Sequence, residues 1–86
     1  MEGGFLGDNI IIEFSWNNTS TDVEIPKSIT ADELINALNS GFNLGIDVDN
    51  PKTYLFRADN PIALIKGDIT IEELGLRNGT VIYFEE

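Results

Sequence analysis

The sequence contains no cysteine and no histidine. Without cysteine there is no disulfide, no thiol nucleophile and no thiolate metal ligand, and without histidine the Ser-His triads and histidine-bound zinc sites are excluded. Small secreted domains usually rely on disulfides for stability, so this absence favours a cytoplasmic location. We expect no bound metal and no cofactor.

Positive charge is also scarce, with 5 Lys and Arg against 15 Asp and Glu and a net charge of −10. Phosphate backbones and anionic lipid head groups repel such a polyanion, so neither nucleic-acid binding nor membrane-surface binding is expected. The acids are interpreted as a solvated surface that keeps the protein soluble, in preference to a dedicated acidic docking face.

Long apolar runs are absent, so neither a membrane helix nor a signal peptide is predicted, and no direct membrane insertion is expected. A length of 86 residues indicates one domain. The glycine-rich residues 1–8 are predicted to be a flexible leader, and residues 9–86 to form the domain.

The first half of the domain predicts a β-hairpin followed by a helix. Apolar residues alternate in "NIIIEFSW" and "TDVEIP", and the Asn-rich "NNTS" between them favours a turn. Thr30 and Glu33 then form a capping box for a helix near residues 30–44, with Gly45 as its expected C-cap. The apolar stripe of this helix is Leu34, Leu38 and Phe42.

The second half predicts two short strands, "TYLFRA" and "PIALI", and a last strand, "TVIYFEE". Thr70 and Glu73 form a second capping box, which starts a short helical turn that Gly75 ends. The preceding "IDVDNPK" alternates acids like the start of a calcium loop, but it lacks the glycine and the distant glutamate, so solvated turn residues are the preferred interpretation.

These elements predict a two-layer α+β domain with the order β-β-α-β-β-(short helix)-β. The order resembles the ubiquitin-like β-grasp fold over residues 9–85: a mixed sheet, one main helix packed on one face, and a short helical turn before the last strand. The stretch "TIEELGL", leading through "RNGT", is similar to the matching part of ubiquitin-like proteins.

More narrowly, the chain resembles the bacterial YukD/EsaB family, ubiquitin-like proteins encoded with type VII (WXG-type) secretion systems. The matched positions are Pro26, Ile29, Thr30, Leu34, Ile35, Leu38, Leu74, Leu76, Asn78 and Gly79. The resemblance implies a cytoplasmic accessory or regulatory factor that binds a protein partner, for which a membrane component of the secretion system is the candidate.

Two alternatives stay open: a β-grasp adaptor unrelated to secretion, and a small enzyme. The carboxylate pairs Asp32-Glu33 and Glu72-Glu73 lie in the first turns of the predicted helices, where the helix dipole favours acids, so no catalytic residue is predicted. Conjugated ubiquitin-like modifiers and sulfur carriers need a flexible Gly-Gly terminus, whereas this chain ends in Phe84-Glu85-Glu86. We therefore expect no conjugation and no sulfur transfer.

Partners of ubiquitin-like folds often dock on the sheet face opposite the helix. Strand alternation places Leu55 and Tyr83 on that face, with Arg57 and Val81 beside them, and these four are the candidate partner-binding residues. Two alternatives are that these residues merely cover the open face, as single exposed apolar residues commonly do, and that a partner adds a strand to an open sheet edge.

Overall fold

The computed structural model describes residues 8–85. Residues 1–7, most of the predicted leader, lie outside the described residues. The elements in chain order are β1 (Asn9–Trp16), β2 (Thr19–Pro26), α2 (Ala31–Phe42), the 3₁₀ turn η1 (Pro51–Thr53), β3 (Leu55–Asp59), β4 (Ala63–Leu64), α3 (Ile71–Leu74) and β5 (Val81–Glu85).

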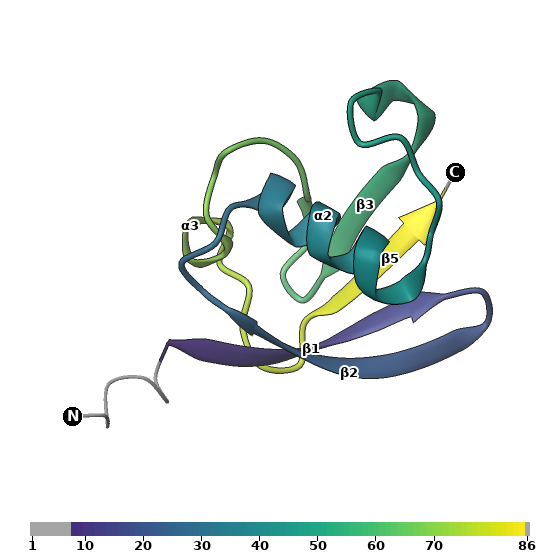
Figure 1. Ribbon diagram of the computed structural model, residues 1–86. Helices are drawn as coiled ribbons and strands as arrows, with labels where there is room; N and C mark the ends of the chain where they lie inside the picture. The colour runs from purple at the N-terminus through teal and green to yellow at the C-terminus, as the bar shows by residue number, and fades with distance from the viewer. Residues whose placement is uncertain (1–7, 86) are drawn as a thin grey trace.

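The strands form one sheet in the order β2-β1-β5-β3-β4. The last strand, β5, lies between β1 and β3, parallel to the first and antiparallel to the second. Helix α2 crosses one face of this sheet, and α3 lies beside the start of α2 (Figure 1). The mixed sheet with one main helix is the α+β β-grasp arrangement that the sequence predicts.

The first hairpin follows from its asparagines. Asn17 and Asn18 have φ values of 56° and 62°, the left-handed region that Asn tolerates better than most residues. A two-residue turn with positive φ at both positions matches the right-handed twist of antiparallel strands. The strands therefore pair along their whole length, from Asn9 opposite Pro26 to Trp16 opposite Thr19.

The two predicted capping boxes are both present, and they lie side by side. Thr30 and Thr70 form an isolated antiparallel bridge, and each helix start hydrogen-bonds the segment before the other. The Ala31 N–H donates to the Ile69 C=O at 2.8 Å, and the Ile71 N–H donates to the Ile29 C=O at 2.9 Å. Amide groups that a helix leaves unpaired at its first turn are thus satisfied reciprocally.

The C-terminus of α2 differs from the prediction. The C-cap is Asn43, with φ 54° and ψ 49°, and not Gly45. Its N–H donates to the Asn39 C=O, so the helix ends two residues before the predicted limit of residue 44. Asn can adopt the left-handed conformation at a helix end, although glycine is the commoner choice. Phe42 still reaches the core, where its ring centroid lies 4.9 Å from that of Phe14.

The predicted strand "PIALI" is reduced to Ala63 and Leu64. The residues before Ala63 belong to a turn that contains Asn60, where φ is 65°. Ile62 in this turn is 88% exposed. At the other end the Ile65 side chain is buried in the core. The core between sheet and helix consists of Ile10, Ile12, Phe14, Ile25, Ala31, Leu34, Ile35, Leu38, Phe56, Ala58, Ile65, Ile71, Leu76, Ile82 and Phe84.

Candidate functional site

The sheet face opposite α2 carries all four candidate residues. Side chains alternate strictly along β3 and β5, with Phe56 and Ala58 buried in β3 and Ile82 and Phe84 buried in β5. The residues between them point to the other face. These are the candidates Leu55, Arg57, Val81 and Tyr83. We call this surface the open face.

Arg57 and Tyr83 form the centre of the open face. They are directly opposite each other on β3 and β5, and the Arg57 guanidinium carbon lies 4.8 Å from the centroid of the Tyr83 ring. One guanidinium nitrogen also lies 3.3 Å from a carboxylate oxygen of Glu85. Because the side chains of Arg57 and Glu85 are 49% and 55% exposed, this ion pair contributes little to stability. The guanidinium therefore contacts both the Tyr83 ring and the Glu85 carboxylate.

Two further apolar residues extend the open face beyond the predicted four. Leu64 on β4 is paired with Arg57 and is 46% exposed, and Ile11 on β1 is 50% exposed. Ile11 lies between the buried Ile10 and Ile12, so the alternation along β1 identifies it as an outward residue. Leu64 was missed because every residue of the predicted strand "PIALI" is apolar, so the run does not show which side faces the core.

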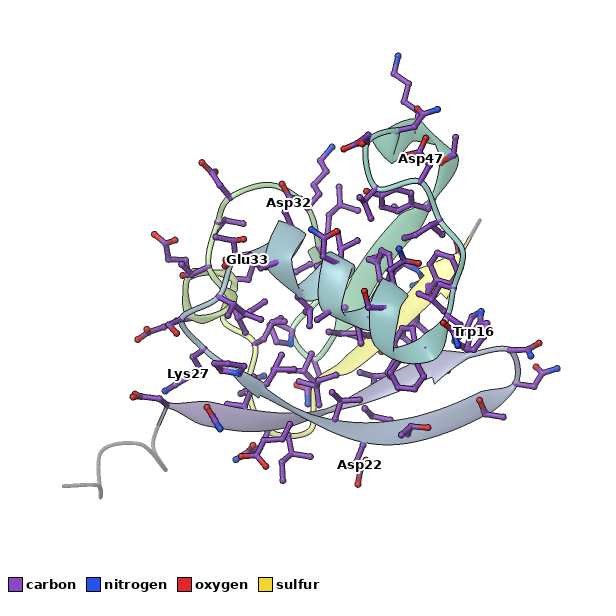
Figure 2. All side chains as sticks on the ribbon, viewed as in Figure 1. Trp16, Asp22, Lys27, Asp32, Glu33 and Asp47 are labelled. Atoms are coloured by element: carbon purple, nitrogen blue, oxygen red, sulfur yellow. The ribbon has the colours of Figure 1, made fainter. Side chains whose placement is uncertain are left out.

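Carboxylates border this apolar surface. Glu13 on β1 and Asp59 on β3 lie on either side of Val81 in the sheet register. Asp22 projects from β2 on the side away from α2 (Figure 2), and Glu24 lies two residues further along the same exposed edge strand. The open face is therefore an apolar and aromatic centre with one arginine, surrounded by negative charge.

The paired carboxylates at the helix starts have structural contacts. Glu33 accepts the Thr30 N–H at 2.8 Å, and Glu73 accepts both the N–H and the hydroxyl of Thr70 at 3.0 Å. These two hydrogen bonds hold the pKa of the Glu73 carboxyl below its ordinary value. Asp32 accepts the Gly67 N–H at 2.9 Å. Within residues 8–85, no group of three or more acidic side chains is arranged to hold a metal ion.

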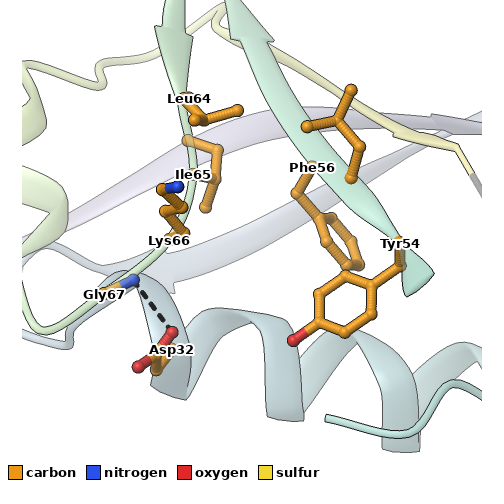
Figure 3. A pocket seen from close by; sticks show the side chains of 8 residues that line it. Asp32, Tyr54, Phe56, Leu64, Ile65, Lys66 and Gly67 are labelled. Carbon is orange, nitrogen blue, oxygen red and sulfur yellow. Dashed lines mark hydrogen bonds between the residues drawn. The ribbon is translucent and has the colours of Figure 1, made fainter. Parts of the chain in front are cut away.

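A pocket of about 440 Å³ opens between β3, α2 and the segment that follows β4. Figure 3 shows the Asp32 carboxylate and the Tyr54 ring at its helix side and Leu64 and Ile65 on the segment opposite β3. The Tyr54 hydroxyl donates to the Val48 C=O at 3.3 Å, which fixes the ring against the loop before β3. Sequence reasoning did not find this pocket, because its walls come from three separate parts of the chain.

The chain has a ubiquitin-like fold. Solved structures with this fold include the C-terminal ubiquitin-like domain of mouse tubulin-specific chaperone e, with 14% identity, 98% of this chain and 92% of that chain covered, and a TM-score of 0.71. The ubiquitin-like domain of tubulin-binding cofactor B has 20% identity, coverages of 90% and 88%, and a TM-score of 0.70. A designed protein based on ubiquitin has 14% identity, coverages of 91% and 88%, and a TM-score of 0.67.

The family is narrower than the fold. Residues 9–84 match the model of YukD, a protein of the WXG100 protein secretion system (Wss), so this chain belongs to the YukD family. The predicted resemblance is thereby confirmed. A comparison with curated proteins found no match. Among residues 8–85, no helix has the length and apolar character needed to cross a membrane.

Proposed function

We propose that this protein is a cytoplasmic accessory factor of a WXG100 secretion system that binds a protein component of the machinery through its open face, without catalysing a reaction. Family membership supports the link to secretion. The observation that carries the docking proposal is the position of Leu55, Arg57, Val81 and Tyr83 on one exposed sheet face, with Arg57 laid over Tyr83.

The chemistry of this surface suits a protein interface. Arg and Tyr are over-represented among the residues that supply most of the binding energy at interfaces, and they do so from central positions. The stacking of Arg57 on Tyr83 and its contact with Glu85 restrict the arginine side chain before a partner arrives. Less conformational entropy is then lost on binding. The bordering carboxylates favour a partner whose contact surface has a basic rim.

The test is a binding measurement with a purified cytoplasmic domain of a membrane component of the secretion system. Replacing both Leu55 and Tyr83 with Ser removes the apolar and aromatic anchors, and we expect the affinity to fall by roughly 100-fold, as for loss of two central interface residues. Leu55 is exposed and Tyr83 is half-buried, so the double change is expected to cost about 1–3 kcal/mol of the free energy of unfolding and to leave the chain folded. Circular dichroism and thermal melting check this point.

The matched control is the double variant with Glu72 and Glu73 replaced by Gln, which keeps the side-chain shape and removes two acids of α3 that are not part of the open face. Its affinity is expected to stay within about twofold of the unmodified protein, the range of a small electrostatic effect. If the Leu55/Tyr83 variant binds normally while the Glu72/Glu73 variant does not, the acidic surface is the binding site and the open-face proposal is wrong.

This proposal assigns the function to the folded surface and not to covalent attachment. Cell extracts separated under denaturing conditions are then expected to show the protein as a single band at the mass of the free chain. A ladder of higher-mass bands that survives denaturation would show conjugation and contradict this part of the proposal.

A further inference from the structure

The outer edge of β3 is only partly covered. Strand β4 pairs with Arg57 and Ala58 alone, and the Ile65 N–H makes one more bond to the Phe56 C=O at 2.9 Å. After Ile65 the chain leaves the sheet and turns to α2. There the N–H and C=O of Gly67 both bond Asp32, at 2.9 Å and 3.0 Å. The pocket described above is the gap that this departure opens beside β3.

Two backbone groups at the start of β3 and just before it face this gap. The N–H and C=O of a strand residue point to the same edge, so the Phe56 N–H points to the side on which its C=O meets Ile65. Tyr54, two residues earlier and also extended (φ −151°, ψ 164°), directs its C=O to the same side. The pairing of β3 with β4 covers only Arg57 and Ala58, and among residues 8–85 no hydrogen bond is found for the Phe56 N–H or the Tyr54 C=O.

This pair of free groups has the spacing of a parallel ladder. In a parallel pair, one residue of the added strand donates its N–H to residue i−1 and accepts from the N–H of residue i+1 of its neighbour. Tyr54 and Phe56 are those two residues around Leu55. A strand running parallel to β3 therefore satisfies both groups with a single residue, without displacing the bond between Phe56 and Ile65.

The pocket walls define which side chains such a strand needs. The central residue of the added strand, paired with Leu55, faces the open side, where Leu55 and Leu64 line the gap. The residues before and after it face the helix side. That side is lined by the rings of Tyr54 and Phe56 and by Ile65, which suit an apolar side chain of moderate or large size.

The charge around the pocket selects a basic segment. The Asp32 carboxylate uses one oxygen for the Gly67 N–H and sits at the pocket wall. Burial of the Tyr54 hydroxyl raises its pKa, and the nearby carboxylates of Asp32, Asp47 and Asp49 raise it further. Lys66 is a positive residue in the lining, but the chain as a whole carries a net charge of −10. A basic segment is therefore attracted over long range and meets a carboxylate on arrival.

We propose that an extended, basic segment of a partner protein binds as an added strand parallel to β3, with one residue bridging the Tyr54 C=O and the Phe56 N–H and a basic side chain at Asp32. This site lies on the sheet edge, goes beyond the open-face docking surface and does not depend on it. Backbone hydrogen bonds supply affinity in this mode of binding, and pockets for alternate side chains supply specificity.

The probe is a set of random seven-residue peptides displayed on phage, selected against the full-length protein. The expected winners alternate apolar residues and carry at least one Lys or Arg. In NMR titrations the winning synthetic peptide slows hydrogen exchange of the Phe56 amide and shifts the signals of residues 54–56 and 65–67. Methylating the backbone nitrogen of its central residue, which removes the donor to Tyr54, lowers the affinity roughly tenfold, as expected for loss of one hydrogen bond with desolvation.

Variants of the protein locate the site. Asp32→Asn keeps the oxygen that accepts from Gly67 and removes only the charge, so the peptide affinity falls roughly fivefold to tenfold. The lost interaction with the helix dipole costs about 1 kcal/mol or less, so the protein stays folded. Tyr83→Ser, on the open face, leaves the peptide affinity within about twofold, because surface sites without shared contacts act independently. For the secretion component, the open-face proposal predicts the opposite pattern: a loss of affinity with Tyr83→Ser and little change with Asp32→Asn. Either proposal can therefore fail alone.

Three outcomes overturn the inference: no peptide is enriched, the enriched peptides are acidic, or the enriched peptides lose affinity with Tyr83→Ser and leave the exchange of the Phe56 amide unchanged. The last outcome assigns peptide binding to the open face.

Discussion

Truncation of Leu38 is the sharpest test of the packing between α2 and the sheet. Leu38 is only 2% exposed and belongs to the apolar stripe that α2 turns toward the strands. Leu38→Ala removes three carbon atoms, and at about 0.8 kcal/mol each their transfer alone accounts for roughly 2.4 kcal/mol. The cavity left behind adds to this, which gives a total loss of about 2–5 kcal/mol.

That loss is large for a protein of this size. At about 0.05–0.15 kcal/mol per residue, a chain of 86 residues has a free energy of unfolding of roughly 4–13 kcal/mol. Urea denaturation followed by circular dichroism therefore shows a clear shift of the midpoint with an unchanged slope. Ser40→Ala, on the exposed side of the same helix, is the control and changes the free energy by about 0.5 kcal/mol or less. A loss below about 1 kcal/mol for Leu38→Ala would refute the assigned packing.

Two further predictions concern side-chain hydrogen bonds of Glu73 and Thr80. The hydrogen bonds from Thr70 lower the folded-state pKa of Glu73, so its contribution to stability is present above the pKa of the unfolded chain and is lost as the pH falls through the folded value. The stability difference between the unmodified protein and Glu73→Gln therefore changes only in this acidic range, and a difference independent of pH contradicts the assignment. The fully buried Thr80 hydroxyl donates to the Asn60 C=O and accepts from the Arg77 N–H. Thr80→Val is therefore expected to lower the free energy of unfolding in urea by about 1–3 kcal/mol. Thr80→Ser keeps the hydroxyl, so it is expected to lower this free energy less.

Much of the fold is encoded in local patterns, which is why it was predictable. The capping boxes at Thr30 and Thr70 each need only four consecutive residues, and both helices begin where these boxes place them. The alternation of "VIYF" fixes which side of β5 is buried, and the same rule places Tyr83 on the open face. Such signals depend on residues close in sequence, so tertiary contacts rarely override them.

The differences arise where two acceptable local solutions compete. Asn43 and Gly45 both have positive φ, and either residue type can end a helix, but Asn43 comes first along the chain. Similarly, the apolar residues of "PIALI" fit a strand, yet the turn at Asn60 and the burial of Ile65 leave only two residues in the sheet. A sequence pattern predicts that an element exists more securely than where it ends.

The pocket beside β3 depends on contacts between distant segments, and no local pattern encodes it. Asp32 reads in the sequence as an ordinary acid at a helix start, and its carboxylate does lie in the first turn of α2. The Asp32 carboxylate also accepts a hydrogen bond from the Gly67 N–H, 35 positions further along the chain, where the chain has left the sheet edge. The unpaired groups at Tyr54 and Phe56 are a consequence of that departure, so they become visible only when the backbone directions are known.

Leu55 connects the two proposed surfaces, and this affects how mutations should be read. Its side chain points to the open face and also lines the pocket at the edge of β3. A loss of binding on changing Leu55 alone therefore does not distinguish docking on the face from strand addition at the edge. Tyr83 belongs only to the open face, where it pairs with Arg57, and Asp32 belongs only to the pocket at the edge of β3. The two single variants at these positions, rather than any variant at Leu55, decide which surface a given partner uses.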